Sequence, residues 1–182
     1  MDVNELLSRY AAGERDFNGM NLHQANLSDI DLSSANFGGA DLSGANLTGA
    51  DLSGCDLSRA NLTDADLSGA NLIGANLSEI NLIGADLINV NLEKTNLSRG
   101  DLRSANLVRA NLCGSNLSET ELSGADLSGA NLTQANLIGS NFNEAELSGA
   151  DLSGVTVTEY EMSGGKTHTG LSHKWVTWAG GR

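Results

Sequence analysis

The sequence has no proline, and aromatic residues make up only 4% of its 182 positions. A hydrophobic core must therefore consist mostly of leucine and alanine. No stretch approaches the roughly 18 consecutive apolar residues of a membrane span. The first ten residues, MDVNELLSRY, lack the basic start and apolar run of a secretory signal. We therefore expect a soluble protein of the cytoplasm that does not associate with membranes.

Positive charge is also scarce in this chain. Lys and Arg number 10 against 23 Asp and Glu, which gives a formal net charge of -13 at pH 7. A surface of this sign repels the phosphate backbone of nucleic acids, so we expect no direct nucleic-acid binding. The same charge favours solubility or a basic protein partner.

The sequence does contain a five-residue repeat, Ala-(Asp/Asn)-Leu-(Ser/Thr)-(Gly/polar), which runs through residues 15–164. Every residue numbered 2 or 7 in its decade, from Phe17 to Leu152, is Leu or Phe, and we call this residue central. A period of five fits neither a helix face nor an alternating strand. The central residue and the small residue two before it must point inward. Gly is frequent two after the central residue, where a type II turn requires positive φ. The pattern predicts a square coil of four pentapeptides.

The residues ADLSGANLTGADLSG (40–54) and their many neighbours resemble the pentapeptide-repeat family over about 30 consecutive units. This resemblance implies an all-β solenoid, a right-handed quadrilateral β-helix of about 20 residues per coil. At about 4.8 Å per coil, roughly seven to eight coils would form a rod about 36 Å long. The N-terminal stretch MDVNELLSRYAAGERDFNGMNL also resembles cyanobacterial members, including the one that promotes heterocyst differentiation.

Residues 1–14 are expected to form a helix that caps the first coil. Asp2 can be its N-cap, Glu5 completes a capping-box pattern, and Gly13 can end it. Without such a cap, the terminal coil of a solenoid leaves apolar side chains and strand edges open. The apolar stripe that would face the coil consists of Val3, Leu6, Leu7 and Tyr10.

The repeat stops after Gly164, and residues 165–182 hold no acid, three bases and both tryptophans. We favour a C-terminal cap over the last coil. A homodimer contact is the alternative, because aromatic residues are the usual anchors of interfaces, and a disordered tail is a third. The apolar residues that would form the cap or the dimer contact are Leu171, Trp175, Val176 and Trp178.

With about 20 residues per coil, residues 20 apart should stack in columns. Phe17 would then lie beside Phe37 near the N-terminal cap. Ile80 would lie beside Gly100, so that a large side chain is next to a missing one.

The two cysteines fall at different positions of the repeat. Cys55 should face inward and Cys113 outward, at a separation on the order of 14 Å that is beyond disulfide reach. Two free thiols fit a reducing compartment.

No set of residues predicts catalysis, a metal or a cofactor. A Leu-filled coil offers no pocket in which unlike groups converge. His168 and His173 have no Cys or acid nearby in sequence to complete a metal site. The repeated Ser stands beside no base, and the Asp/Asn before each central residue is expected to bond local backbone or to form ladders between coils. We therefore expect that the protein is not an enzyme and needs no cofactor.

The bases of the repeat gather in one coil. Residues 16–93 hold eleven acids against Arg59 alone, and residues 110–164 hold eight acids and no base. Between these segments lies the basic belt, with one base predicted on each face of a single coil: Lys94, Arg99, Arg103 and Arg109. One column should also alternate in sign, as a mildly stabilising surface ladder that salt screens: Arg59, Glu79, Arg99 and Glu119.

Four aliphatic residues occupy outward positions near the belt, where Ser or Thr is usual: Ile73, Ile83, Ile88 and Val108. Isolated exposed aliphatic residues are common, but four within two coils make a candidate binding patch. Together with Arg59 and the basic belt, they form the candidate partner-binding surface.

The sequence favours a noncatalytic scaffold that binds another protein, with a regulatory role in stress or differentiation. The family resemblance implies an alternative, because some members mimic duplex DNA, bind DNA gyrase and protect it from quinolones. The rod would carry about one net negative charge per 2.8 Å, against one per about 1.7 Å in duplex DNA. The basic belt would interrupt such a mimic.

Overall fold

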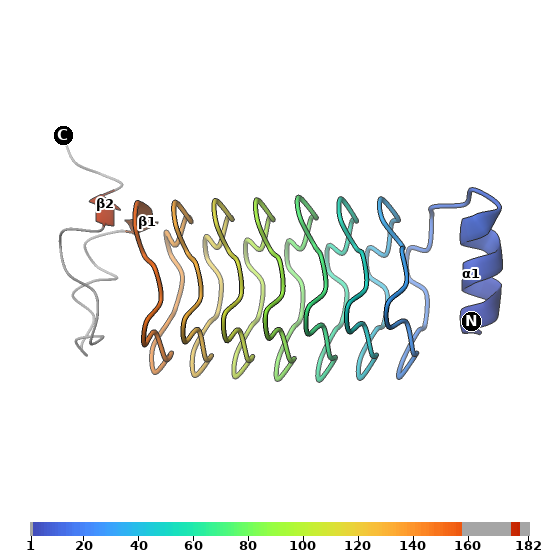
Figure 1. Cartoon of the computed structure of the whole chain (residues 1–182), viewed down its shortest axis with the longest axis horizontal. Helices are drawn as coiled ribbons and strands as arrows, with labels where there is room; N and C mark the ends of the chain where they lie inside the picture. The colour runs from blue at the N-terminus through green and yellow to red at the C-terminus, as the bar shows by residue number, and fades with distance from the viewer. Residues whose placement is uncertain (1, 158–175, 179–182) are drawn as a thin grey trace.

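The computed structural model of the chain describes residues 2–157 and 176–178. A short helix, α1 (Val3–Ala11), lies across one end of a rod of stacked coils (Figure 1). At the other end, β1 (Val155–Val157) pairs in parallel with β2 (Val176–Trp178). No described residue belongs to a helix long and apolar enough to cross a membrane.

The coils are joined by parallel bridges between residues 20 apart. The series of isolated bridges begins with Asp16 opposite Asn36 and ends with Asn136 opposite Thr156. This confirms the predicted stacking in columns. A turn in every unit leaves a single bridging residue, the Asp/Asn position, so most extended pieces are too short to be strands.

The turn of each unit has the predicted geometry. Ala60 N–H donates to the carbonyl of Leu57 at 3.1 Å, which closes a four-residue turn. Its third residue, Arg59, has a φ of 57°, and Gly54 in the preceding unit has a φ of 64°. Positive φ at the third residue alone is the type II pattern. The same position also accepts residues with long side chains, which project from the coil.

The interior is built from the central residues and the small residues between them. Leu57 and Ala60 are both fully buried. Phe17 and Phe37 stack with ring centroids 5.5 Å apart, as predicted from their column. An ideal Cβ on Gly100 would lie 3.3 Å from Ile80 Cγ2, which confirms that this large residue and this glycine are neighbours.

Helix α1 closes the N-terminal end of the rod. Leu6 is fully buried, and the rest of the predicted stripe packs partly buried against the core. Tyr10 donates from its hydroxyl to the carbonyl of Ser33 at 3.0 Å, which ties the helix to the first coil. Asp2 is the N-cap of the helix, as predicted, and its carboxylate accepts from the N–H of Asn4, the second helical residue, at 3.2 Å.

The C-terminal prediction falls largely on residues that the structure does not describe. Leu171, Trp175 and the predicted boundary at Gly164 lie outside the described residues, and only the backbone of Val176 and Trp178 is described. That backbone adds a parallel strand to the last coil, with Val155 opposite Val176. The choice between a cap, a dimer contact and a disordered tail stays a prediction.

Candidate partner-binding surface

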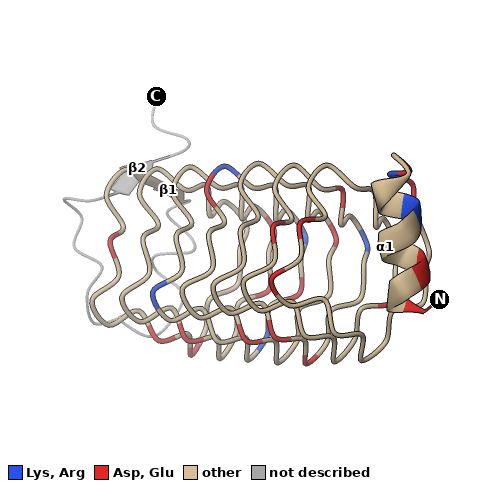
Figure 2. Cartoon of the chain, turned by 45° about the vertical axis from the view of Figure 1, so that its right-hand side comes forward, with Lys and Arg blue, Asp and Glu red and all other residues tan. Residues whose placement is uncertain are grey.

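The basic belt comes from four consecutive pentapeptides of one coil. Lys94, Arg99 and Arg109 occupy the positive-φ turn position, whereas Arg103 directly follows a central leucine. All four side chains are exposed. Basic residues appear on different sides of the rod among more numerous acids (Figure 2). The four bases therefore do not converge, and one flat partner cannot contact all of them.

Three of the four belt bases are already paired with carboxylates of this chain. Lys94 Nζ lies 2.9 Å from Glu93 Oε1, and its hydrogen bond to Glu93 raises the pKa of Lys94. Arg103 reaches an oxygen of Asp101 at 2.7 Å, and this hydrogen bond lowers the pKa of Asp101. Arg99 Nε lies 2.9 Å from Glu119 Oε2. These pairs reduce the positive charge that the belt offers to a partner.

The alternating column forms two ion pairs rather than a continuous ladder. Arg59 Nε lies 2.9 Å from Glu79 Oε2, one coil away, as the column predicts. The hydrogen bond from Arg59 is the main cause that lowers the pKa of Glu79, and the charge of Arg99 is the smallest. Exposed pairs of this kind stabilise a fold only slightly, because water and salt screen them.

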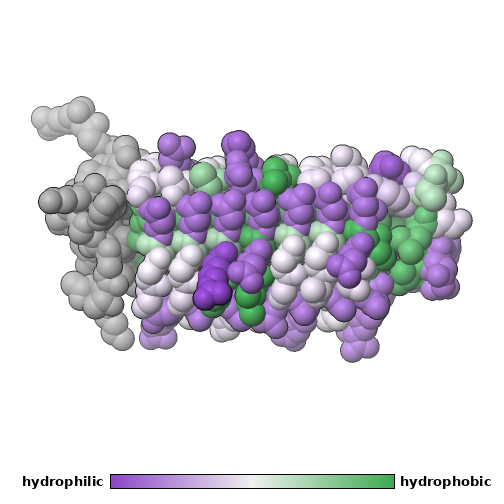
Figure 3. Space-filling model, in the orientation of Figure 1, coloured by the Kyte–Doolittle hydropathy of each residue, from purple (hydrophilic) through white to green (hydrophobic). Residues whose placement is uncertain are grey.

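The four aliphatic residues do not form one patch. Ile88 and Val108 are stacked on one face, as shown by the bond from Asn89 N–H to the Val108 carbonyl at 3.0 Å. Ile73 is 40% exposed and Ile83 is half-buried, and each lies in a different column. On the face seen in Figure 3, hydrophobic spots lie on either side of a continuous hydrophilic row.

The Asp/Asn position has both of its predicted structural roles. Asn96 Oδ1 accepts from Ser98 N–H at 3.2 Å, a bond to local backbone. Its side-chain amide donates to Asn76 Oδ1 in the preceding coil at 3.2 Å, and Asn116 donates in the same way to Asn96 at 3.2 Å. These hydrogen bonds stabilise the scaffold.

The cysteines are placed as the repeat predicts. Cys55 is buried, and burial raises the pKa of its thiol to about 11, so it is protonated at neutral pH. Cys113 is half-exposed, and both thiols are free.

One constellation escaped the sequence analysis because its members lie in different coils. Ser43 donates to Asp41 at 2.6 Å, and His23 Nδ1 lies 2.8 Å from the same hydroxyl. The serine lies between the acid and the histidine, whereas a catalytic triad needs the histidine in the middle. The separation of 20 residues between His23 and Ser43 is the sequence signal that predicts their contact. The group acts as a surface hydrogen-bond network.

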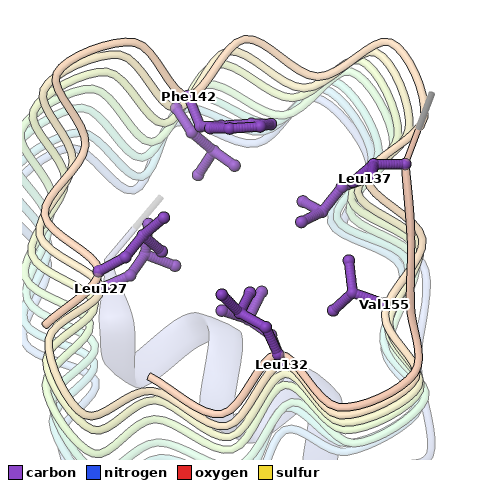
Figure 4. Close-up of a pocket in the computed structure, with 9 residues that line it drawn as sticks. Leu127, Leu132, Leu137, Phe142 and Val155 are labelled. Carbon is purple, nitrogen blue, oxygen red and sulfur yellow. The ribbon is translucent and has the colours of Figure 1, made fainter. Parts of the chain in front are cut away.

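A cavity of about 20 Å³ lies inside the C-terminal coils. Its lining residues point inward from all sides, and every one of them is apolar, including Leu127, Leu132 and Phe142 (Figure 4). The cavity therefore supplies no acid, base or nucleophile. Within residues 2–157 and 176–178, no group of three or more His, Cys, Asp or Glu side chains could hold a metal. His168 and His173, which we did not expect to form a metal site, lie outside the described residues.

Comparison with known proteins adds family evidence to this geometry. The sequence model described as "Pentapeptide repeats" matches eight copies, in overlapping segments that together span residues 16–158. HetL of the cyanobacterium Nostoc sp. strain PCC 7120 is described as a pentapeptide repeat protein involved in heterocyst differentiation regulation. It is 33% identical, and the match covers 85% of this chain and 96% of HetL with a TM-score of 0.42.

Two further solved structures are similar over most of the chain. A pentapeptide repeat protein of the cyanobacterium Cyanothece 51142 is 32% identical, with 81% of this chain and 93% of that chain covered and a TM-score of 0.34. QnrB1, a plasmid-mediated fluoroquinolone resistance protein, is 19% identical, with 92% and 91% covered and a TM-score of 0.42. Among the curated proteins, no match was found.

Proposed function

The chain belongs to the pentapeptide-repeat family, and from this premise we propose that it is a noncatalytic scaffold that binds another protein. The fold we propose in detail is a right-handed quadrilateral β-helix of about seven to eight coils. The partner is a protein rather than a nucleic acid or a membrane, and the compartment is the cytoplasm. We also propose a regulatory role in stress or differentiation, and the description of HetL supports differentiation.

One observation carries this proposal, which is the rigid lattice that holds the surface side chains. Leu57 N–H donates to the carbonyl of Asn76 at 2.7 Å, and Asn76 N–H donates to that of Cys55 at 2.8 Å. The same two bonds recur from coil to coil, so each turn residue is held at a fixed height along the rod. A preorganised surface loses little conformational entropy when it binds a partner.

Affinity capture from host lysate tests the proposal directly. The wild-type rod is expected to retain a stoichiometric partner, and simultaneous reversal of Arg99, Arg103 and Arg109 to Glu is expected to abolish capture. Circular dichroism of the variant checks that the coil is intact. If no protein is captured, or if capture survives the triple reversal in a folded variant, the scaffold proposal with this surface is wrong.

The alternative function is a DNA mimic that binds DNA gyrase. The net charge of -13 and the acids distributed along the rod in Figure 2 favour it. The basic belt counts against it because it interrupts the acidic surface. Gyrase supercoiling assays with and without a quinolone decide the matter. A mimic must change supercoiling or quinolone sensitivity at micromolar protein, and no effect there excludes it.

A further inference from the structure

Arg109 differs from the rest of the basic belt in having no carboxylate partner. No ion pair with Arg109 occurs among the described residues, whereas Lys94, Arg99 and Arg103 each contact a carboxylate of this chain. A guanidinium with five donors and no acid partner can bind a carboxylate in bidentate fashion. Of the four bases, Arg109 is the one whose charge an external acid can pair without breaking an existing bond.

The surroundings of Arg109 are partly apolar. Val108 precedes it in the same unit, and Ile88 lies beside Val108 in the neighbouring coil. In the next coil the corresponding turn residue is Gly129, whose ideal Cβ would lie 3.5 Å from Arg109 Cγ, so the arginine stem rests on a residue without a side chain. An arginine that neighbours aliphatic side chains has the composition of an interface anchor.

Acids in the two coils next to that of Arg109 limit the charges that a partner can carry. Asn106 in the same unit bridges Asp86 in the preceding coil and Asp126 in the following one. At about 4.8 Å per coil, Asp86 and Asp126 lie roughly 10 Å apart along the rod, one coil on either side of Asn106, which is three residues before Arg109. A polyacidic partner would be repelled by them, whereas basic residues that flank a single acid would match all three charges.

We propose that the face carrying Ile88, Val108 and Arg109 is the docking surface, and that it binds a protein segment with one carboxylate between basic residues and an aliphatic side chain. The carboxylate pairs with Arg109, the bases face Asp86 and Asp126, and the aliphatic side chain covers Ile88 and Val108. This inference rests on the proposed scaffold function. It restricts binding to one of the four faces.

Single charge reversals separate this face from the rest of the belt. Arg109→Glu should weaken binding of the captured partner at least about tenfold, as expected for an anchor residue. The matched control Arg103→Glu, on an adjoining face of the same coil, should change it by less than about threefold. Val108→Ser should weaken binding without a change of charge. If both arginine reversals act equally, the single-face inference is wrong although the scaffold function stands.

Photo-crosslinking identifies the bound segment. A photo-reactive amino acid at Ser128, next to Val108 in the same column, should crosslink the partner, and one at Ser78 on another face should not. The crosslinked peptide should contain an acid flanked by bases, and changing that acid to Lys should restore binding to Arg109→Glu. A peptide without this pattern, a crosslink to a second copy of this chain, or no rescue overturns the inference. If the wild-type rod captures no protein, the inference and the scaffold function are both wrong.

Discussion

Asparagine and aspartate are not equivalent at the position before each central residue. Asn96 donates to Asn76 in the coil before it and accepts from Asn116 in the coil after it. Asp56 accepts from Asn76 at 3.1 Å but cannot donate. An asparagine can therefore form side-chain hydrogen bonds to the coils before and after it, whereas an aspartate can only accept a bond from the coil after it.

This difference gives a prediction for a single-atom substitution. Asn96→Asp removes the bond to Asn76 and places a carboxylate oxygen beside Asn76 Oδ1, so we expect a loss of about 1–2 kcal/mol in the free energy of unfolding. Asp56→Asn is the matched control, because an amide oxygen can still accept from Asn76, and its effect should stay within about 0.5 kcal/mol. Urea denaturation measures both. Equal effects of the two substitutions would refute the ladder argument.

The two ends of the rod differ in how well their interiors are filled. At the N-terminal end, Phe17 and Phe37 are stacked and almost fully buried under α1. At the C-terminal end, Phe142 follows Leu122 in one column, and both line the 20 Å³ cavity. Phe142 is 8% exposed, against 0% for Phe17.

A second aromatic residue should fill the C-terminal cavity. Leu122→Phe would place a ring against Phe142, as Phe17 lies against Phe37, and we expect a gain of about 0.5–1.5 kcal/mol in the free energy of unfolding. Leu82→Phe is the control, because Leu82 is in the same column but does not line the cavity. Overpacking there should cost about 1–3 kcal/mol. Thermal unfolding distinguishes the two, and the idea fails if Leu122→Phe destabilises the protein as much as Leu82→Phe.

The interior of the rod could be predicted from the sequence because a strict period fixes which residues stack. Three features follow from spacing alone: the Phe17–Phe37 pair, the contact of Ile80 with Gly100, and the apolar stripe of α1 that packs on the core. The end of the repeat could not be predicted in the same way. Val155 pairs with Val176, a step of 21 residues rather than 20, because no repeat sets the register there.

The ion pairs of the candidate surface were harder to predict than the packing of the interior, because a long charged side chain can reach several carboxylates. The column rule found Arg59 with Glu79 and Arg99 with Glu119. It missed that Lys94 pairs with Glu93 and Arg103 with Asp101, within their own units. These pairs follow from rotamers that sequence spacing does not determine. Sequence spacing could not show that Arg109 has no ion pair among the described residues, because this depends on which carboxylates the other three bases contact.

Across the whole molecule, many carboxylates are held ionised by hydrogen bonds from the serine two residues later. Bonds from the Ser68 hydroxyl and N–H lower the pKa of Asp66, and Ser43 and Ser153 act in the same way on Asp41 and Asp151. Asp31 and Glu146 also have lowered pKa values through Ser33 and Ser148. Because these residues are spread along the rod, protonation weakens many coils at once.

The sign of the resulting pH dependence follows from these directions. A carboxylate whose pKa is lower in the folded state contributes stability above its unfolded pKa of about 3.9, and loses it as the pH falls through the folded value. The urea midpoint should therefore change little from about pH 7 to 5 and should decrease below about pH 4. Asp66→Asn should show a shallower decrease, because the amide keeps the bond from Ser68 N–H but does not titrate. A midpoint that stays constant down to about pH 2.5, or a variant with the same slope as the wild type, would show that these serine bonds do not hold the coils together.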